Sequence, residues 1–225
     1  MAKNQHPVTN RSKGASQWQD DYWLLLMQIY LRKPVGVKPM YSRPLVELGM
    51  ELHIAPEQLY ARLEQIARLE TPRIERIWLE YSRNPKRLTR AVQLLRGMIG
   101  FGNSDFYAGV EIEETFERDF RPLEEDNRLT PVMLVVLLDL YFQLTPPTMV
   151  AETPEVRQTA SLLKIPVPLV LDVLNVYQHC DPYLQRHDVV ISPLLGPCQQ
   201  VWQRYVSEDP RPLSAYAQQL KAYFK

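Results

Sequence analysis

A group of basic side chains in the first part of the chain is the best candidate for binding an anion. Four of the five recur at spacings that place them on one helix face, and no acidic residue occurs between positions 80 and 105. Such a face can hold phosphates, and each neutralised phosphate steepens the salt dependence of binding by about one unit. The alternative is a solvated face paired with nearby acids. The residues are Arg83, Lys86, Arg87, Arg90 and Arg96.

Possible metal ligands gather near the end of the chain. His179, Cys180, Asp181, His187 and Cys198 fall within a short stretch, and thiols with imidazoles are typical zinc ligands. Their spacing follows none of the usual zinc patterns, because there is no CxxC and no HxxxH. We expect a surface turn with a buried cysteine here, and no bound metal or cofactor.

Catalytic patterns are weak in this sequence. Gly97, Gly100 and Gly102 give G-x-x-G-x-G, but they follow a predicted helix, whereas a dinucleotide fingerprint follows a strand. There is no nucleophile elbow, no phosphate loop and no HExxH, and acid pairs such as Glu113 with Glu117 fall in a predicted linker. We therefore predict a protein that is not an enzyme.

Two short runs, one in each half of the chain, share a pattern of small and apolar residues. A small residue is followed by apolar residues three, five and ten positions later. In the first run these are Gly49, Leu52, Ile54 and Leu59, and in the second they are Ala160, Leu163, Ile165 and Val170. Each run resembles a helix-turn-helix over about 20 residues. Both depart from that family at the turn, where His53 and Lys164 replace the usual glycine.

The resemblance implies that the second helix of the first run enters a DNA groove. The side chains that would approach bases and phosphates there are Gln58, Arg62, Gln65 and Arg68. Glu57 and Glu64 on the same helix oppose this use by repelling phosphates. In the second run the matching helix is almost wholly apolar, apart from Asp172 and Asn175. It is expected to be buried or to meet another protein.

Proline and capping residues divide the chain into helices. Ser16, Ser42, Thr71, Asn84, Thr130 and Thr153 are candidate N-caps, and five of the six directly precede a proline or lie within two residues of one. The expected helices cover residues 18–31, 44–52, 56–69, 73–81 and 86–98, and then 131–142, 154–163 and 168–178. The helices at 18–31 and 131–142 are apolar nearly all round, which is typical of the centre of a bundle.

A shift of 111 residues aligns the two halves without a gap. It places Tyr30 on Tyr141 and Gln28 on Asp139, and it superimposes the caps, breaks and apolar faces. With a small gap, the segment 106–108 also lies over 215–217. These coincidences predict a structural duplication. The alternative is two unrelated helical stretches with similar spacing. The four tryptophans are expected to fill the core.

Composition limits the possible partners. The 225 residues carry 26 basic and 26 acidic side chains, so no global field attracts nucleic acid or an anionic membrane. The longest apolar run, 132–138, is far shorter than the roughly 20 residues of a membrane span. Two cysteines fit a reducing compartment, and we expect a cytoplasmic protein with no membrane contact.

Together these features predict an all-α fold, a tandem duplication of a small helical domain with a helix-turn-helix-like core. The expected divisions are a disordered tail (1–15), a first repeat (16–110), an acidic linker (111–128) and a second repeat (129–225). The leading hypothesis is a non-enzymatic protein that binds duplex DNA or another nucleic acid through the first repeat, with packing or self-association through the second. The alternative is a protein–protein adaptor that binds no nucleic acid.

Overall fold

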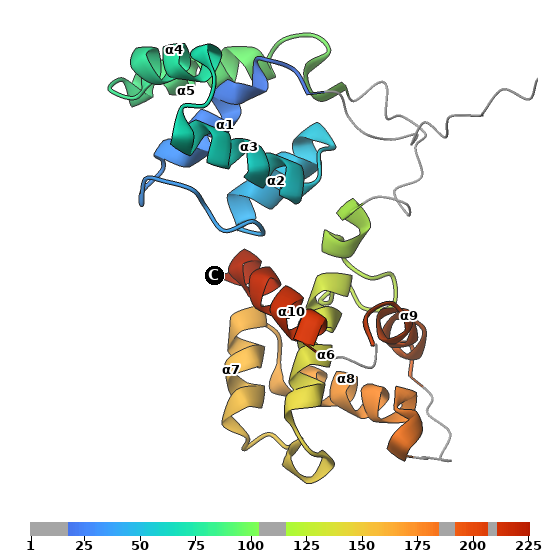
Figure 1. The fold of residues 1–225 in the computed structure, drawn as a ribbon. Helices are drawn as coiled ribbons and strands as arrows, with labels where there is room; N and C mark the ends of the chain where they lie inside the picture. Colours follow the sequence, from blue (N-terminus) through green and yellow to red (C-terminus); the bar gives the residue numbers. More distant parts are fainter. Residues whose placement is uncertain (1–17, 104–115, 185–191, 207–210) are drawn as a thin grey trace, which may run out of the picture.

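Helices are the regular secondary structure of the chain in the computed structural model, which describes residues 18–103, 116–184, 192–206 and 211–225 (Figure 1). These ranges contain ten α-helices and no strand, so the predicted all-α class is confirmed. The α-helices are α1 (Tyr22–Leu31), α2 (Arg43–Leu52), α3 (Pro56–Arg68), α4 (Pro72–Tyr81), α5 (Pro85–Arg96), α6 (Pro131–Gln143), α7 (Pro154–Leu163), α8 (Val167–Cys180), α9 (Leu195–Tyr205) and α10 (Arg211–Phe224).

Proline marks the first turn of most of these helices, as the sequence predicts. Three predicted N-caps form: the side chains of Thr71, Asn84 and Thr130 each accept a hydrogen bond from a backbone N–H in the first turn, at 3.2–3.3 Å. Each bond satisfies one of the donors that a helix leaves free at its N-terminus. Short 3₁₀ segments occur at η1 (Phe101–Asn103), η3 (Phe116–Phe120), η4 (Pro146–Thr148) and η5 (Pro182–Leu184).

Two other predicted N-caps are wrong, because the residue stands at the start of its helix but its side chain forms no capping hydrogen bond. Ser42 and Thr153 stand at the N-cap positions of α2 and α7, but neither side chain caps its helix. The Ser42 hydroxyl is buried without a partner, and the Thr153 hydroxyl instead donates to the backbone oxygen of Thr148 at 2.5 Å. Ser16 lies outside the described residues.

Each half is built around one apolar helix. In the first half α1 contacts α2, α3, α4 and α5, and in the second half α6 contacts α7, α8, α9 and α10. Eight side chains of α6, from Leu134 to Tyr141, are buried in succession, as the all-round apolar pattern predicts. The buried apolar residues therefore form two clusters, one around each central helix.

Helix boundaries in the two halves correspond at the predicted offset of 111 residues. Helices α2 and α7 match at both ends, and α3 and α8 begin in register. The turns match too, because His53 and Lys164 both adopt the left-handed conformation, with φ of 55° and 57°. A residue with a Cβ is strained there, and glycine is the residue that usually takes this place. The correspondence agrees with a duplication, which itself stays a prediction.

The two halves are joined through α10 and α2. In Figure 1 the C-terminal helix lies between the first half and the rest of the second half, and α10 contacts α2 as well as α6 and α7. Tyr41 and Val46 come from the first half, but they are buried in the apolar cluster of the second. The rings of Tyr41 and Tyr216 meet edge to face, with centroids 5.7 Å apart. The halves thus share part of one core.

Length and hydropathy of the helices bear on membrane insertion. Among the described residues no single helix is long and apolar enough to span a bilayer. Helices α7 and α8 reach that length and hydropathy only as a pair, and the pair is bent by 110°.

Candidate functional site

Arg62, predicted to approach a DNA groove, lies instead against aromatic rings of its own half. Its guanidinium carbon is 4.1 Å from the ring centroid of Trp18 and 5.6 Å from that of Trp23. Burial in this contact lowers the pKa of Arg62. A guanidinium held over two indoles gains a cation–π interaction that it would lose by turning toward a phosphate.

The rest of the predicted groove-binding face of α3 is electrically neutral. Gln58 is exposed and Gln65 is half-buried, so both amides reach the surface. Arg68 is exposed and lies 4.0 Å from the Glu64 carboxylate, while Tyr41 donates a hydrogen bond to Glu57. Acidic side chains thus match the basic ones along α3, and the positive surface that phosphates need is missing there.

The predicted phosphate-binding residues gather on the α4–α5 hairpin. Arg83, Lys86 and Arg90 are exposed, and none of the acidic groups in the described ranges forms an ion pair with them. Arg87 differs, because its guanidinium lies 2.7 Å from the Glu80 carboxylate. Helices α3 and α5 both pack on α1, and no extensive contact joins them. The two predicted groups of site residues therefore belong to separate surfaces.

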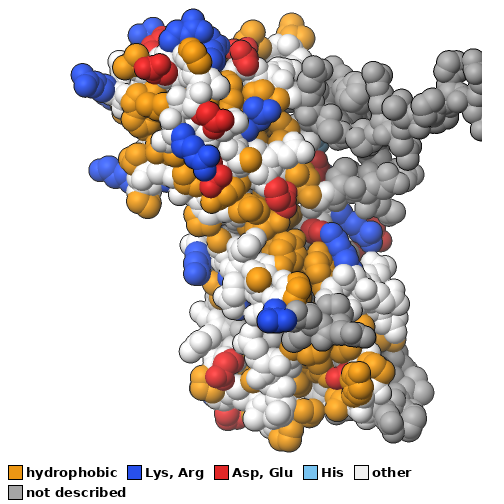
Figure 2. Space-filling view, in the orientation of Figure 1, with side chains coloured by type: hydrophobic (Ala, Val, Ile, Leu, Met, Phe, Trp, Pro, Cys, Tyr) orange, Lys and Arg blue, Asp and Glu red, His pale blue; other side chains and the backbone are white. Residues whose placement is uncertain are grey.

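Large apolar side chains are exposed beside these cations. Leu79 on α4 and Leu94 on α5 are 72% and 74% exposed, and Met98 and Ile99 follow α5 with exposures of 61% and 106%. Figure 2 shows basic side chains projecting over α4 and α5, with hydrophobic side chains between them. Sequence reasoning missed this surface. Its signal was present, since Leu94 falls outside the apolar face of α5 that buries Leu88, Val92 and Leu95.

The apolar helix of the second half is buried, which was one of its two expected placements. Helix α8 packs between α6, α7 and α9, and seven of its side chains are buried. The hydroxyl of Tyr177 donates to the backbone oxygen of Leu134 at 2.9 Å, so its polar end is satisfied as well. Pro168, Asp172 and Asn175 are its exposed positions. Self-association through the second half stays a prediction.

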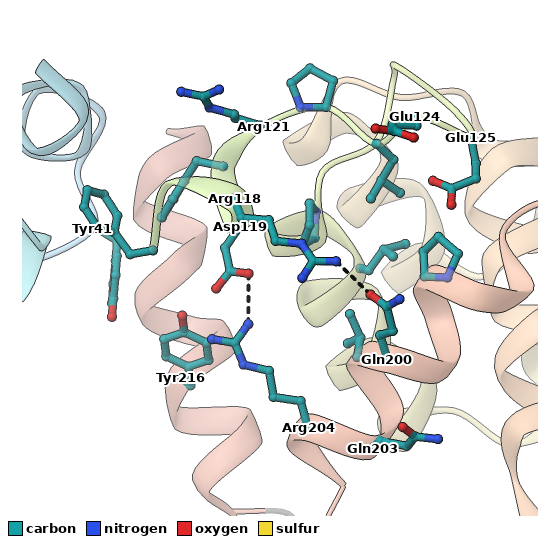
Figure 3. Close-up of a pocket in the computed structure, with 18 of the residues that line it drawn as sticks. Tyr41, Arg118, Asp119, Arg121, Glu124, Glu125, Gln200, Gln203, Arg204 and Tyr216 are labelled. Atoms are coloured by element: carbon teal, nitrogen blue, oxygen red, sulfur yellow. Dashed lines mark hydrogen bonds and ion pairs between the residues drawn. The ribbon is translucent and has the colours of Figure 1, made fainter. Parts of the chain in front are cut away.

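A cavity of about 960 Å³ lies between the halves (Figure 3). Two arginines of its lining are held by hydrogen bonds within the protein. Arg204 donates to the Asp119 carboxylate at 2.9 Å, and Arg118 donates to Gln200 at 3.1 Å. Tyr216 lies beside Arg204, and burial raises the pKa of its hydroxyl. These pairs connect η3 with α9, which gives the cavity wall a structural role.

The predicted acidic linker contains a buried carboxylate. Glu117 on η3 is 3% exposed, and its side chain lies 2.7 Å from His53 Nδ1 and 3.3 Å from Arg121. His53 is the left-handed residue that ends α2, so this contact attaches η3 to the turn between α2 and α3. Residues 104–115, which include Glu111, Glu113 and Glu114 of the predicted linker, lie outside the described residues.

Neither the cysteines nor the glycines form a recognisable reactive site. Cys180 and Cys198 are free thiols, and burial raises their pKa to about 11 and about 12, so they are protonated and unreactive near neutral pH. Within the described residues no three of the groups that bind metals come together, and His187 falls outside them. Gly97, Gly100 and Gly102 follow α5 and lead into η1, whereas the glycines of a dinucleotide fingerprint follow a strand.

On the α4–α5 hairpin, cations without an ion pair among the described residues thus occur together with exposed apolar side chains. This hairpin combines three of the predicted site residues with leucines that the sequence analysis did not select. Compared with known proteins, the chain matches no family model, and no curated protein and no solved structure shows significant similarity to it.

Proposed function

We propose that the protein is a non-enzymatic protein-binding module that contacts its partner through the α4–α5 hairpin. The observation that carries this proposal is the exposure of Leu79, Leu94 and Met98 on a hairpin whose cations Arg83, Lys86 and Arg90 have no acidic partner among the described residues. Exposed apolar side chains of this size are typical of surfaces that another protein covers. The zero net charge of the chain agrees with a protein partner.

Nucleic-acid binding stays a second candidate because Arg83, Lys86 and Arg90 are exposed and form no ion pair with any residue that the structure describes. Three cations on one hairpin suffice for weak, salt-sensitive contact with phosphates. The groove-reading part of that hypothesis has less support, since Arg62 is held over Trp18 and the α3 face is neutral. Duplex DNA offers phosphates to the cations but no apolar surface to Leu94.

Photo-crosslinking distinguishes the two candidates. We would place benzoylphenylalanine at position 94 in the full chain, with Gln158, an exposed position on α7, as the matched control site. We expect adducts specific to position 94 that protease destroys and nuclease does not. The protein identified in them should then bind the purified chain, and Leu94→Ser should weaken that binding. Nuclease-sensitive adducts would favour the nucleic-acid hypothesis, and equal labelling at both sites would refute a binding surface on the hairpin.

A further inference from the structure

One side of α5 carries a line of cations that continues into apolar residues. Lys86, Arg90 and Leu94 follow one another at intervals of four residues, so they lie along one side of the helix. This side faces away from the core, where the opposite face of α5 buries Leu88, Val92 and Leu95. Met98 and Ile99 extend the apolar end beyond the helix. We define the α5 stripe as Lys86, Arg90, Leu94, Met98 and Ile99.

The cations at the basic end of the α5 stripe are available to bind an anionic partner. No ion pair holds Lys86 or Arg90 among the residues that the structure describes, and helix α5 itself contains no acidic residue. Arg83 adds a third exposed cation at the start of this end. An anionic partner could therefore bind these cations without first breaking an ion pair within the protein, so binding does not carry the free-energy cost of that step.

The apolar end of the α5 stripe differs in charge from the basic end. Arg96, the last residue of α5, donates two hydrogen bonds to Glu51 of α2 at 2.6 and 2.7 Å, and Glu47 lines the same small groove. This cation is therefore already paired and adds no available charge to the apolar end. The arrangement thus favours a partner whose negative charge is confined to one end.

Resting on the proposed function, we propose that the α5 stripe binds an acidic amphipathic helix of a partner protein. Carboxylates one turn apart on that helix pair with Lys86 and Arg90, and leucine or phenylalanine side chains further along cover Leu94 and Met98. A helix matches because its i, i+4 neighbours repeat with the spacing of the stripe. The pattern of charge then fixes the direction of the bound helix, since reversing it would place carboxylates on Leu94.

A peptide with this pattern tests the proposal in the full chain. The probe is a fluorescent helical peptide of about 16 residues, with glutamates four residues apart at one end and leucines four residues apart at the other. A peptide of the same composition with the two residue types alternating is its control. We expect saturable binding of the first peptide, measured by fluorescence anisotropy. The dissociation constant should rise at least tenfold in the double variant Lys86→Glu, Arg90→Glu and in the single variant Leu94→Ser. The matched control is Lys33→Glu, an exposed cation outside the hairpin.

Charge reversal on both sides gives the decisive result. A peptide with lysines in place of the glutamates should bind the Lys86→Glu, Arg90→Glu variant and not the original chain. Equal binding of the patterned and alternating peptides, or no rescue by the lysine peptide, would overturn the proposal. So would tighter binding to phosphatidylserine vesicles or to a duplex DNA than to the patterned peptide. If position 94 still crosslinks to a protein while the peptide fails, the proposed function stands and only the helical acidic partner is excluded.

Discussion

Replacing Gly49 by alanine tests how closely α2 meets the turn that follows it. A Cβ at this position would lie 2.7 Å from the backbone oxygen of Ile54 and 3.4 Å from the ring of Phe116. The first contact is shorter than real Cβ atoms tolerate. The Ile54 backbone cannot easily retreat, because its N–H donates to the Gly49 oxygen at 3.0 Å.

The expected cost follows from two opposing effects. Forcing an extra methyl into a packed site destabilises a protein by about 1–3 kcal/mol. Alanine in a helix interior gains about 1 kcal/mol over glycine, which offsets part of that cost. Because the 2.7 Å contact is with a backbone atom, the upper part of that range, about 2–3 kcal/mol, applies here. We expect Gly49→Ala to lower the free energy of unfolding by about 1–2 kcal/mol. At the corresponding position of the second half, Ala160 is accommodated with 3% exposure, so the clash belongs to the first half alone.

Urea unfolding followed by tryptophan fluorescence measures this change. The matched control is Gly97→Ala, since a Cβ there has its nearest neighbours at 3.6 Å, an ordinary contact. Gly97 has a helical φ of −82°, which alanine adopts without strain. We therefore expect the free energy of unfolding of the Gly97→Ala variant to equal that of the original protein or to exceed it by up to about 1 kcal/mol. A Gly49→Ala protein as stable as the original would refute the close approach described for the α2–α3 turn.

Three further results are expected. Lys221→Met should lower the free energy of unfolding by about 2–3 kcal/mol, because it leaves the buried Asp139 carboxylate without its ion pair at 3.2 Å; adding Asp139→Leu should recover most of the loss in urea unfolding. Arg62→Ala should shift the fluorescence emission to longer wavelength, because it uncovers an indole, and a retained spectrum would contradict that contact. Half-buried Cys180 and buried Cys198 have raised pKa values of about 11 and about 12, so the thiols of the unfolded chain ionise first as pH rises above their ordinary pKa of 9.0. Stability should therefore fall from about pH 9 toward pH 12, and less steeply in Cys198→Ala.

Local signals in the sequence predicted the helices well because they act over a few residues. Proline after Thr71, Asn84 or Thr130 predicted helix starts that the structure shows to within a residue. The offset of 111 predicted that His53 and Lys164 occupy equivalent turns. Both predictions depend on backbone geometry that neighbouring residues determine.

Contacts between distant segments escaped prediction because no local pattern encodes them. The stacking of Arg62 on Trp18 and the burial of Glu117 against His53 join residues that are 44 and 64 positions apart. An arginine on a helix surface and a glutamate in an acidic run have the same local pattern whether solvated or buried. The candidate site was predicted in part: Lys86 and Arg90 were selected, but the exposed Leu94 requires knowing which face of α5 meets the core.

The position of α10 has a consequence for how the molecule melts. Two apolar clusters around two central helices would lead one to expect two thermal transitions. Because α10 contacts α2 as well as α6 and α7, and Tyr41 and Val46 of the first half are buried in the cluster of the second, unfolding of one half should destabilise the other. A calorimetric scan should then show a single cooperative peak, whose van't Hoff and calorimetric enthalpies agree.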